Sequence, residues 1–160
     1  MKKIHDDNYY MDMAIKEGKK AKEIDEVPIG AVIVCDGKIV ARAYNKKNTS
    51  KNALKHAEIL AIQKLQKKIK DWHFYNATLY TTLEPCPMCA GAIINFRVGR
   101  VVFGAYDKKA GSCGSVINLL TQKEFNHHPD FTGGVKEQEC SEMLTKFFKE
   151  KRDGNKGNYK

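Results

Sequence analysis

The sequence predicts a layered α/β fold in one domain. Segments with apolar residues at helical spacing alternate along the chain with short β-rich runs, a pattern typical of helices packed on a sheet. The chain has 160 residues, of which 42% are hydrophobic, and this is sufficient for one core of ordinary size. It contains no internal repeat and no linker that would divide it. We therefore expect one domain over residues 1–152, followed by a frayed basic tail over 153–160.

Each expected element has its own local pattern. Helices are expected where apolar residues recur every three or four positions, and strands where β-branched residues are enriched. Asp36-Gly37 between two β-rich runs favours a tight hairpin turn. In chain order the expected elements are a helix around 10–21, strands over 29–35 and 38–43, a polar loop over 45–55, a helix over 56–68, a strand over 77–82, a helix over 86–95, a strand over 100–104, a Gly/Ser-containing loop over 111–115, a short helix over 116–120, a turn-rich segment over 126–134 and a last helix over 141–151.

The most informative motif combines one imidazole, two thiols and a carboxylate. The chain reads His-Ala-Glu at 56–58 and Pro-Cys-Pro-Met-Cys at 85–89, each at the start of an expected helix. His56, Cys86 and Cys89 are three ligands of the kind that zinc prefers, and a catalytic zinc site keeps its fourth position for water. Glu58 then stands where a general acid/base is needed. This His-x-Glu and Pro-Cys-x-x-Cys pattern is the signature of zinc-dependent base deaminases, and it predicts one Zn²⁺ ion per subunit.

Less specific interpretations of the motif stay open. A Cys-x-x-Cys pair also occurs as a redox pair or as half of a structural zinc site. A structural site would need a fourth protein ligand, for which the sequence offers Cys113, Cys140 or His127. The combination of both motifs, their order and the flanking prolines favours the catalytic interpretation.

The charge of the chain suggests a polyanionic partner. The formal net charge is +9 and the pI is about 9.3. Residues 42–70 contain nine Lys or Arg and a single acid, Glu58, and residues 146–160 contain six basic residues against two acids. Basic clusters beside a catalytic motif favour nucleic acid as the substrate.

Other features favour a cytoplasmic protein without a membrane partner. No stretch approaches the roughly 20 apolar residues of a membrane span. The N-terminal residues lack the apolar segment of a signal peptide. The chain has five cysteines, which is an odd number, and two of them belong to the metal motif. This count does not indicate a disulfide framework.

These motifs together resemble the bacterial tRNA-specific adenosine deaminase family, within the cytidine deaminase-like superfamily. The resemblance covers about residues 13–152, with its most specific stretches at 27–32, 56–59, 82–92 and 100–105. The tRNA branch is indicated by residues 103–107, the 111–115 loop, Asn126-His127 and the basic helix that carries Phe147-Phe148. The resemblance implies a three-layer α/β/α fold with a five-stranded mixed sheet and helices on both faces. It also implies a homodimer that binds the anticodon stem-loop of tRNA.

The resemblance also implies roles for individual residues. His56, Cys86 and Cys89 would hold zinc, and Glu58 would carry protons. The implied substrate-binding residues are Asn45 at the base or its sugar, Val27, Pro28, Ala57 and Glu84 around the base pocket or behind the metal, Asp107 at the ribose, Asn126, and Phe147, Phe148 and Arg152 at the anticodon loop.

The implied reaction is hydrolytic deamination of adenosine to inosine at the wobble position of the tRNA anticodon. An alternative within the superfamily is a deaminase of free guanine or cytosine, which would not need the basic excess of residues 42–70. A further alternative is an RNA-binding module stabilised by structural zinc.

The chain departs from the family pattern just before the histidine motif. The family usually has Asp-Pro and then an alanine adjacent to the histidine, whereas residues 52–55 read Asn-Ala-Leu-Lys here. Because a proline that would restrict the backbone is missing, we expect a looser loop at this point.

Overall fold

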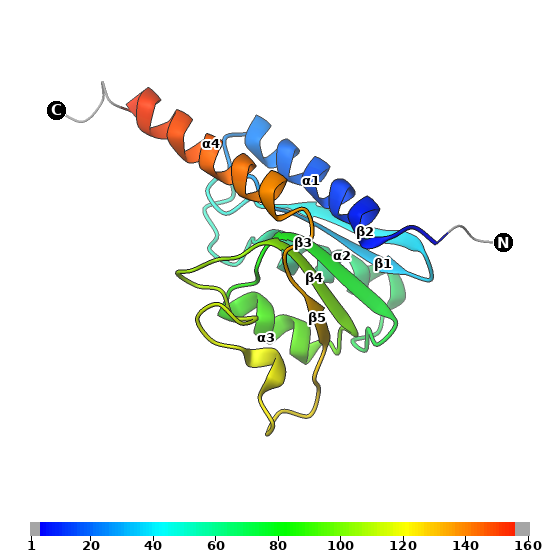
Figure 1. The fold of residues 1–160 in the computed structure, drawn as a ribbon. Coiled ribbons are helices and arrows are strands. Elements are labelled where there is room, and N and C mark those ends of the chain that lie inside the picture. Colours follow the sequence, from blue (N-terminus) through cyan, green and yellow to red (C-terminus); the bar gives the residue numbers. More distant parts are fainter. Residues whose placement is uncertain (1–3, 156–160) are drawn as a thin grey trace.

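A five-stranded mixed sheet forms the middle of three layers in the computed structural model, which describes residues 4–155 (Figure 1). Two helices cover each face of the sheet. The layered α/β fold that the sequence predicts, and the three-layer α/β/α arrangement that the family resemblance implies, are therefore confirmed.

The order of the strands brings three strand ends to one edge of the sheet. β1 (Gly30–Cys35) pairs antiparallel with both β2 (Lys38–Tyr44) and β3 (Ala77–Leu83). β4 (Arg100–Ala105) runs parallel to β3, and β5 (Asp130–Thr132) runs parallel to β4, so the order is β2-β1-β3-β4-β5. β2 and β3 therefore point the same way, and the chain leaves β2, β3 and β4 at the same edge.

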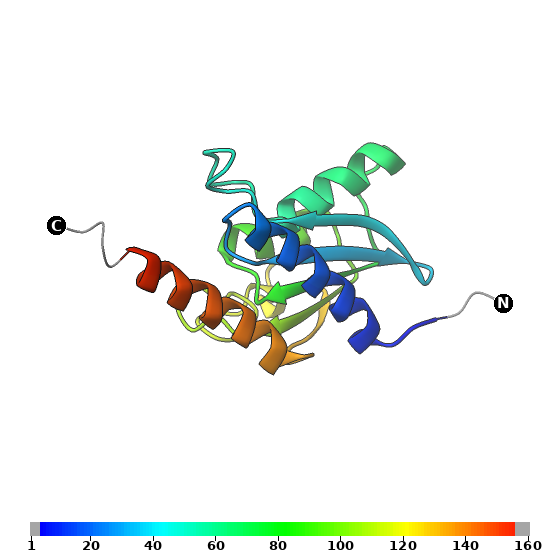
Figure 2. The same cartoon turned by 90° about the horizontal axis from the view of Figure 1, so that it is seen from above.

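The helices divide into two pairs, one on each face. α1 (Asp7–Glu23) and α4 (Glu137–Asn155) lie side by side over one face, whereas α2 (Ala57–Ile69) and α3 (Pro87–Asn95) cover the other (Figures 1 and 2). Because successive side chains of a strand point to opposite faces, each strand contributes to two cores. On β1, for example, Ile33 packs with α2 and α3 and its neighbour Val32 packs with α1.

The expected short helix at 116–120 was wrong. The structure has a single 3₁₀ turn, η1 (Leu119–Thr121), at whose start the side chain of Asn118 accepts from the backbone amide of Leu120. The backbone amide of Val116 donates to Gly111 O, and Gly114 N donates to Ile117 O. These loop hydrogen bonds hold residues 116 and 117 outside any helical turn.

The C-terminal third of the chain also differs from expectation. The segment predicted to be turn-rich, 126–134, contains the short strand β5. α4 begins at Glu137 rather than at residue 141. The first turn is polar, so it lacks the apolar spacing that predicts a helix, but its acidic residues suit a helix N-terminus. α4 continues to Asn155, so residues 153–155 of the expected tail are helical, and residues 156–160 lie outside the described part.

Within residues 4–155, none of the helices has the length and apolar character needed to cross a bilayer.

Candidate active site

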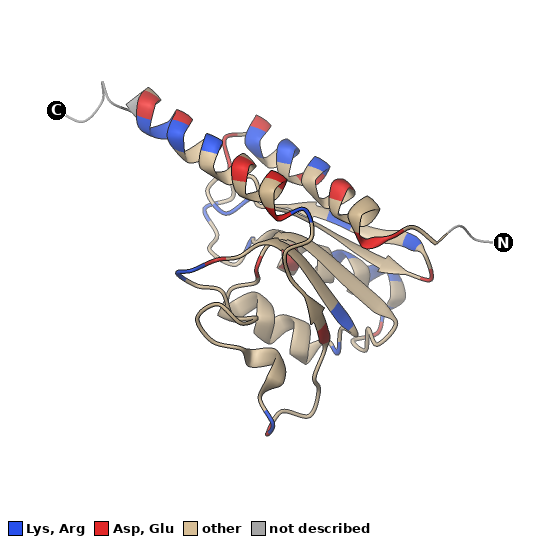
Figure 3. Ribbon diagram, viewed as in Figure 1, with Lys and Arg blue, Asp and Glu red and all other residues tan. Residues whose placement is uncertain are grey.

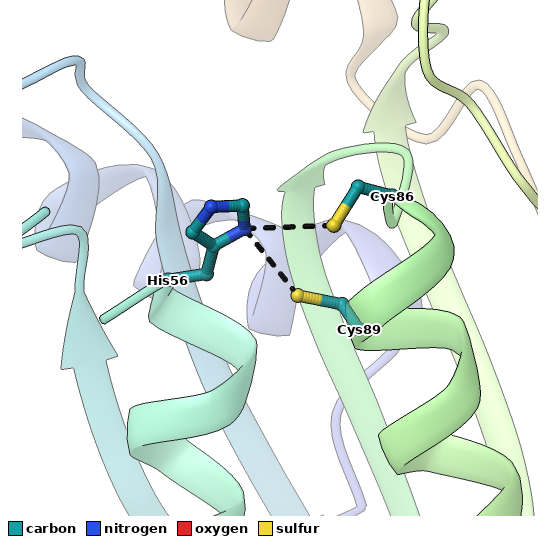
Figure 4. A group of neighbouring side chains, drawn as sticks. All are labelled: His56, Cys86 and Cys89. Carbon is teal, nitrogen blue, oxygen red and sulfur yellow. Dashed lines mark hydrogen bonds between the residues drawn. The ribbon is translucent and has the colours of Figure 1, made fainter. Parts of the chain in front are cut away.

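Two helix starts meet at the edge where the strands end. His56 occupies the N-cap position of α2, and Cys86 occupies that of α3, where Pro87 is the first helical residue. Proline suits this position because its missing N–H would have no partner inside the helix. Neither His56 nor Cys86 uses its side chain as a helix cap. Both side chains instead turn toward each other, with Cys89 from the first turn of α3 completing the group (Figure 4).

The separations within this group fit a tetrahedral zinc site. His56 Nδ1 lies 3.6 Å from Cys86 Sγ and 3.5 Å from Cys89 Sγ, and the possible ligand atoms all lie within 4.8 Å of one another. Usual Zn–N and Zn–S distances at a tetrahedral angle place nitrogen and sulfur about 3.6 Å apart. No other group of three metal-binding side chains occurs among residues 4–155. These three residues are therefore a zinc-ligand set.

The two sulfurs show why this group requires a cation. Hydrogen bonds from Cys89 and His56 lower the pKa of the Cys86 thiol to about 4, although burial opposes the shift. The pKa of Cys89 is raised, first because its thiol donates to Cys86 and then because it is buried. A divalent cation would compensate two thiolates and allow both to bind.

Glu58 supplies a buried carboxyl group beside the ligands. It lies in the first turn of α2, is only 4% exposed, and accepts a hydrogen bond of 3.1 Å from Thr81 Oγ1 on β3. Burial raises its pKa above the usual glutamate range. It is not part of the ligand group. A buried carboxyl group beside the ligands, with its pKa raised, suits general acid/base catalysis.

A pocket of about 220 Å³ opens beside His56, Glu58 and Cys86. Its walls come from segments that enter β1 or leave β2, β3 and β4, together with the start of α2. Its remaining lining residues are Val27, Ile29, Asn45, Lys47, Ala57, Leu83, Glu84, Asp107 and Ala110.

Five of the predicted substrate residues line this pocket, namely Val27, Asn45, Ala57, Glu84 and Asp107. Pro28 is buried and is not among the lining residues, whereas its neighbour Ile29 lines the pocket. Adjacent side chains of an extended segment point in opposite directions, which explains why Ile29 rather than Pro28 lines the pocket. The role of Pro28 around the base pocket or behind the metal stays a prediction.

Asn45 is held on both sides of its amide. Its Nδ2 donates to Val27 O at 3.3 Å, and its Oδ1 accepts from Lys47 N at 3.1 Å. The side chain thus joins two walls of the pocket. Asp107 Oδ1 accepts from the amides of Lys109 and Ala110, which shapes the turn after β4.

Glu84 supports the loop after β4. Its oxygens accept from the amides of Asp107, Cys113 and Ser115 at 3.1 Å each, and also from the Ser115 hydroxyl. Gly111 packs so closely on this carboxylate that a Cβ there would lie 2.4 Å from the Glu84 carboxyl carbon. Glu84 therefore anchors residues 107–115 beside the metal ligands.

The other predicted substrate residues lie outside the pocket lining. Asn126 is exposed and lines a separate hollow next to α3. Phe147, Phe148 and Arg152 lie on α4, over the opposite face of the sheet. Phe147 is buried against the protein, whereas Phe148 and Arg152 are exposed.

The residues considered as a fourth ligand are engaged elsewhere. Cys113 is buried in the core on the α2/α3 face, and Cys140 is buried in the core on the α1/α4 face. His127 Nε2 lies 2.6 Å from Val98 O. Within residues 4–155 the zinc site therefore has three protein ligands, as a catalytic site requires.

The sequence interpretation missed Ile29, Leu83, Ala110 and Thr81 as site residues, and it counted Lys47 only among the basic residues of 42–70. Thr81 carried a detectable signal, because it is a polar residue at an inward position of a strand just before the cysteine motif. The others gave no signal of their own, since only the fold brings them to the pocket.

A layered fold with a three-ligand metal centre, a buried carboxyl group and an adjacent pocket defines the zinc-dependent deaminases. The protein-family model of the cytidine and deoxycytidylate deaminase zinc-binding region matches residues 4–105 of this chain. The chain is 51% identical to the tRNA-specific adenosine deaminase of Bacillus subtilis over 94% of its length and 93% of that protein. It is 40% identical to the tRNA-specific adenosine deaminase of Haemophilus influenzae, over 94% of this chain and 87% of that protein. The chain therefore belongs to the zinc-binding deaminases, and among them to the tRNA-specific adenosine deaminase family.

Solved structures show the same fold. One, from studies of A-to-I editing by tRNA:A34 deaminases at the wobble position of transfer RNA, superposes with a TM-score of 0.82 at 40% identity, covering 85% of this chain and 99% of that one. A guanine deaminase from Nitrosomonas europaea superposes with a TM-score of 0.75 at 19% identity, covering 91% and 86%, and shares the fold.

Proposed function

We propose that this protein hydrolyses the adenosine at position 34 of a tRNA anticodon to inosine and ammonia. The observation that carries the proposal is the three-ligand centre with a buried carboxyl group, open to a pocket of about 220 Å³. The pocket is smaller than the roughly 300–1,000 Å³ of sites for drug-sized ligands. Its size suits one base that has left the stack, as base-modifying enzymes require. The relatives at 40–51% identity are adenosine deaminases of tRNA, and this supports adenosine as the target nucleoside.

The chemistry divides between the ligand set and Glu58. A zinc ion held by His56, Cys86 and Cys89 would lower the pKa of a water molecule to about 7. Glu58 accepts a proton from the attacking water and delivers it to N1 of the adenine ring. The C6–O bond forms, Glu58 then takes the proton of the new C6 hydroxyl and passes it to the amino nitrogen, and the C6–N bond breaks to release ammonia. Thr81 keeps the Glu58 carboxyl group in place through its hydrogen bond.

The lining residues hold the base for this reaction. Asn45, fixed by Val27 and Lys47, offers an amide to the base or its sugar. Asp107 also lines the pocket, and its carboxylate can accept from a ribose hydroxyl. Val27 and Ala57 provide apolar contact for the flat faces of the base. Together they orient C6 toward the ligand set.

RNA outside the pocket would meet two basic surfaces, the loop after β2 and the C-terminal half of α4. Figure 3 shows acidic residues toward the N-terminal half of α4, and toward its other end basic residues with Glu150 and Asp153 among them. Phe148 and Arg152, both exposed there, offer a stacking face and a phosphate contact to the anticodon stem-loop. Phe147, which is buried, would act by supporting the helix. The substrate is cellular tRNA, which implies a cytoplasmic enzyme.

The same proposal includes a homodimer. Val116, Ile117 and Phe125 are exposed apolar side chains on the segment that packs beside α3. Phe125 and Asn126 border a hollow of about 290 Å³ at that helix. Exposed apolar side chains of this kind favour contact with a partner molecule. Light scattering of the purified protein should give twice the 18.1 kDa mass of the chain.

The decisive experiment supplies tRNA and looks for inosine. The protein is incubated with tRNAs that carry A34 and with an anticodon stem-loop, and the products are analysed by mass spectrometry. Free adenine, guanine and cytosine are assayed in parallel. Inosine confined to position 34 is expected. Deamination of a free base, with the tRNA left unchanged, would contradict the proposal and favour the free-nucleobase alternative. A guanine deaminase has the same fold.

A further inference from the structure

Glu26 is a buried carboxylate that the reaction does not use. It lies between the end of α1 and the pocket segment that starts at Val27, and none of its surface is exposed. One of its oxygens accepts from Asn48 N at 3.0 Å. The other accepts from Thr49 N at 2.8 Å and from Thr49 Oγ1 at 2.5 Å. All three donors belong to the loop that follows β2.

This loop, residues 45–55, carries two kinds of groups. Asn45 and Lys47 line the base pocket. Lys46, Lys51 and Lys55 add three more positive charges. In Figure 2 the loop projects from the body of the protein beside the start of α2. A projecting, lysine-rich loop at the mouth of a pocket is placed to meet the phosphates that flank a captured nucleotide.

Few bonds connect the projecting loop to the body. The backbone of Asn45 donates to Ile29 O, and its side chain donates to Val27 O. Within the loop, Lys46 N donates to Lys55 O, and an Asn52 side chain accepts from Leu54 N. Asn52 thereby makes a local turn where the family has a proline. The internal bonds shape the loop, but the Glu26 contacts attach its outer part to the fold.

The chemistry of the contact suits positioning rather than stability. A buried carboxylate loses hydration, and the hydrogen bonds that replace it commonly only offset that cost. A carboxylate accepts from several N–H and O–H groups at once, however, and such charge-assisted bonds fix geometry well. Glu26 receives two amides and a hydroxyl from consecutive residues. The contact thus specifies one placement of the loop.

We propose that Glu26 is a positioning residue for RNA capture. It holds residues 45–49 so that Asn45 and Lys47 face the pocket and the loop lysines face the RNA backbone. The inference rests on the proposed function, because it assigns part of the tRNA-binding step. Glu26 touches neither the ligand set nor Glu58 in the described contacts, so its removal should act on binding and leave the chemical step intact.

The test compares Glu26→Gln with Glu17→Gln. The amide side chain keeps the shape of glutamate but has one acceptor oxygen, so at least one loop donor loses its partner. Glu17 is also buried, at 3% exposed, but pairs with Lys20 on α1 and not with the loop. In Glu26→Gln we expect KM for tRNA to rise about tenfold with kcat within about twofold. The slope of log KM against log salt should flatten by about one unit, because phosphate contacts are lost. Glu17→Gln should change none of these.

Hydrogen exchange supplies a measurement that does not depend on activity. The amides of Asn48 and Thr49 should exchange at least about tenfold faster in Glu26→Gln, with α2 and α3 unchanged. Unchanged exchange, or faster exchange with an unchanged KM, would overturn the proposal. A fall in kcat at constant KM would overturn it too, since that would place Glu26 in the chemical step. Absence of tRNA deamination by the unaltered protein would refute the proposed function, whereas exchange would still report whether Glu26 holds the loop.

Thr49→Val provides a milder change that retains the buried carboxylate. It removes one donor and keeps the Thr49 amide, so we expect KM to rise about twofold. Because the hydroxyl acts through Glu26, the double variant should resemble Glu26→Gln alone rather than show the product of the two effects. Independent, multiplicative effects would contradict the shared contact.

Discussion

The two faces of the sheet use buried residues differently. On the α2/α3 face, polar groups are buried at the sheet edge and all of them have a partner, as with Glu58 and Thr81 or Glu84 and its loop. On the α1/α4 face the core cluster is apolar, one buried acid of α1, Glu17, pairs with Lys20, and other charges lie on the surface in ion pairs such as Lys22–Glu150. The difference separates two tasks. Catalysis needs charges shielded from water, whereas the opposite face provides packing and the outer surface that we propose meets RNA.

The largest effect should come from Glu58→Ala on the α2/α3 face. We expect deamination to fall by about 10²- to 10⁴-fold, because the proton carrier is lost. Zinc should remain bound at one ion per chain, because Glu58 is not a ligand. Single-turnover assays and metal analysis check both parts. Glu17→Ala removes a buried carboxylate from α1 and should keep its activity. Loss of zinc from Glu58→Ala would contradict the role assigned to this residue.

Cys86→Ser should come next, by removing both zinc and stability. Metal binding is coupled to folding, and a ligand present at a hundred times its Kd stabilises the folded state by about 2.7 kcal/mol. A chelator should lower the melting temperature of the unaltered protein and leave that of Cys86→Ser unchanged. Cys35→Ser, at a half-buried cysteine outside the ligand set, should respond to the chelator as the unaltered protein does. A metal-replete Cys86→Ser protein would break the assignment.

Changes on the α1/α4 face should act on binding. Replacing both Lys151 and Arg152 with Ala should weaken tRNA binding and flatten the salt dependence of log K by about one to two units, at roughly 0.7–0.9 per phosphate. Lys151 already pairs with Asp25, so Arg152 should account for the larger share. The rate at saturating tRNA should stay nearly constant. Titrations of each single variant at several salt concentrations separate the two residues. An unchanged slope would leave the loop after β2 as the RNA contact.

The smallest effect should come from Asp7, where α1 meets the sheet. Its carboxylate accepts from both Arg100 nitrogens at 2.8 and 2.7 Å, and this pairing, together with Tyr80, lowers the pKa of Asp7. A lowered folded-state pKa gives stability that is present above the unfolded value of about 3.9 and lost as pH falls through the folded value.

We therefore expect Asp7→Asn to be less stable than the unaltered protein at pH 7, by at most about 1 kcal/mol, because both partners are about a third exposed to screening water. The gap should shrink below pH 4. Urea unfolding at pH 7 and pH 3 measures it. Asp12→Asn, whose pair with Lys136 is more exposed, should show a smaller gap. A difference that grows in acid would have the wrong sign for this linkage.

The ligand set could be predicted from the sequence because its determinants are local. His56, Cys86 and Cys89 each lie at a helix start that the chain itself encodes, through proline, spacing and an apolar stripe. Glu58 follows from its place two residues after the histidine. The hairpin at Asp36-Gly37 and the alternation of helices and strands were predictable for the same reason.

Contacts that join distant parts of the chain were not predictable in this way. The Glu26 contact spans more than twenty residues, and no local pattern marks an acid after a helix as a loop anchor. β5 has three exposed residues, and their composition does not mark a strand. The strand forms because it pairs with β4. The place of Ile29 rather than Pro28 in the pocket lining depends on the register of β1. The tertiary structure decides such features.

The position of the metal ligands at helix starts has an evolutionary consequence. The catalytic groups belong to rigid elements, whereas the walls that touch the base come from four connecting segments, which can change in length and composition with little effect on the core. New substrates can therefore arise through mutations in those segments while the proton carrier and the cation stay in place. A common scaffold with guanine deaminases at 19% identity is consistent with such divergence. Laboratory selection for a new base should accordingly enrich substitutions at 27–29, 45–49 and 107–110 before any at the helix starts.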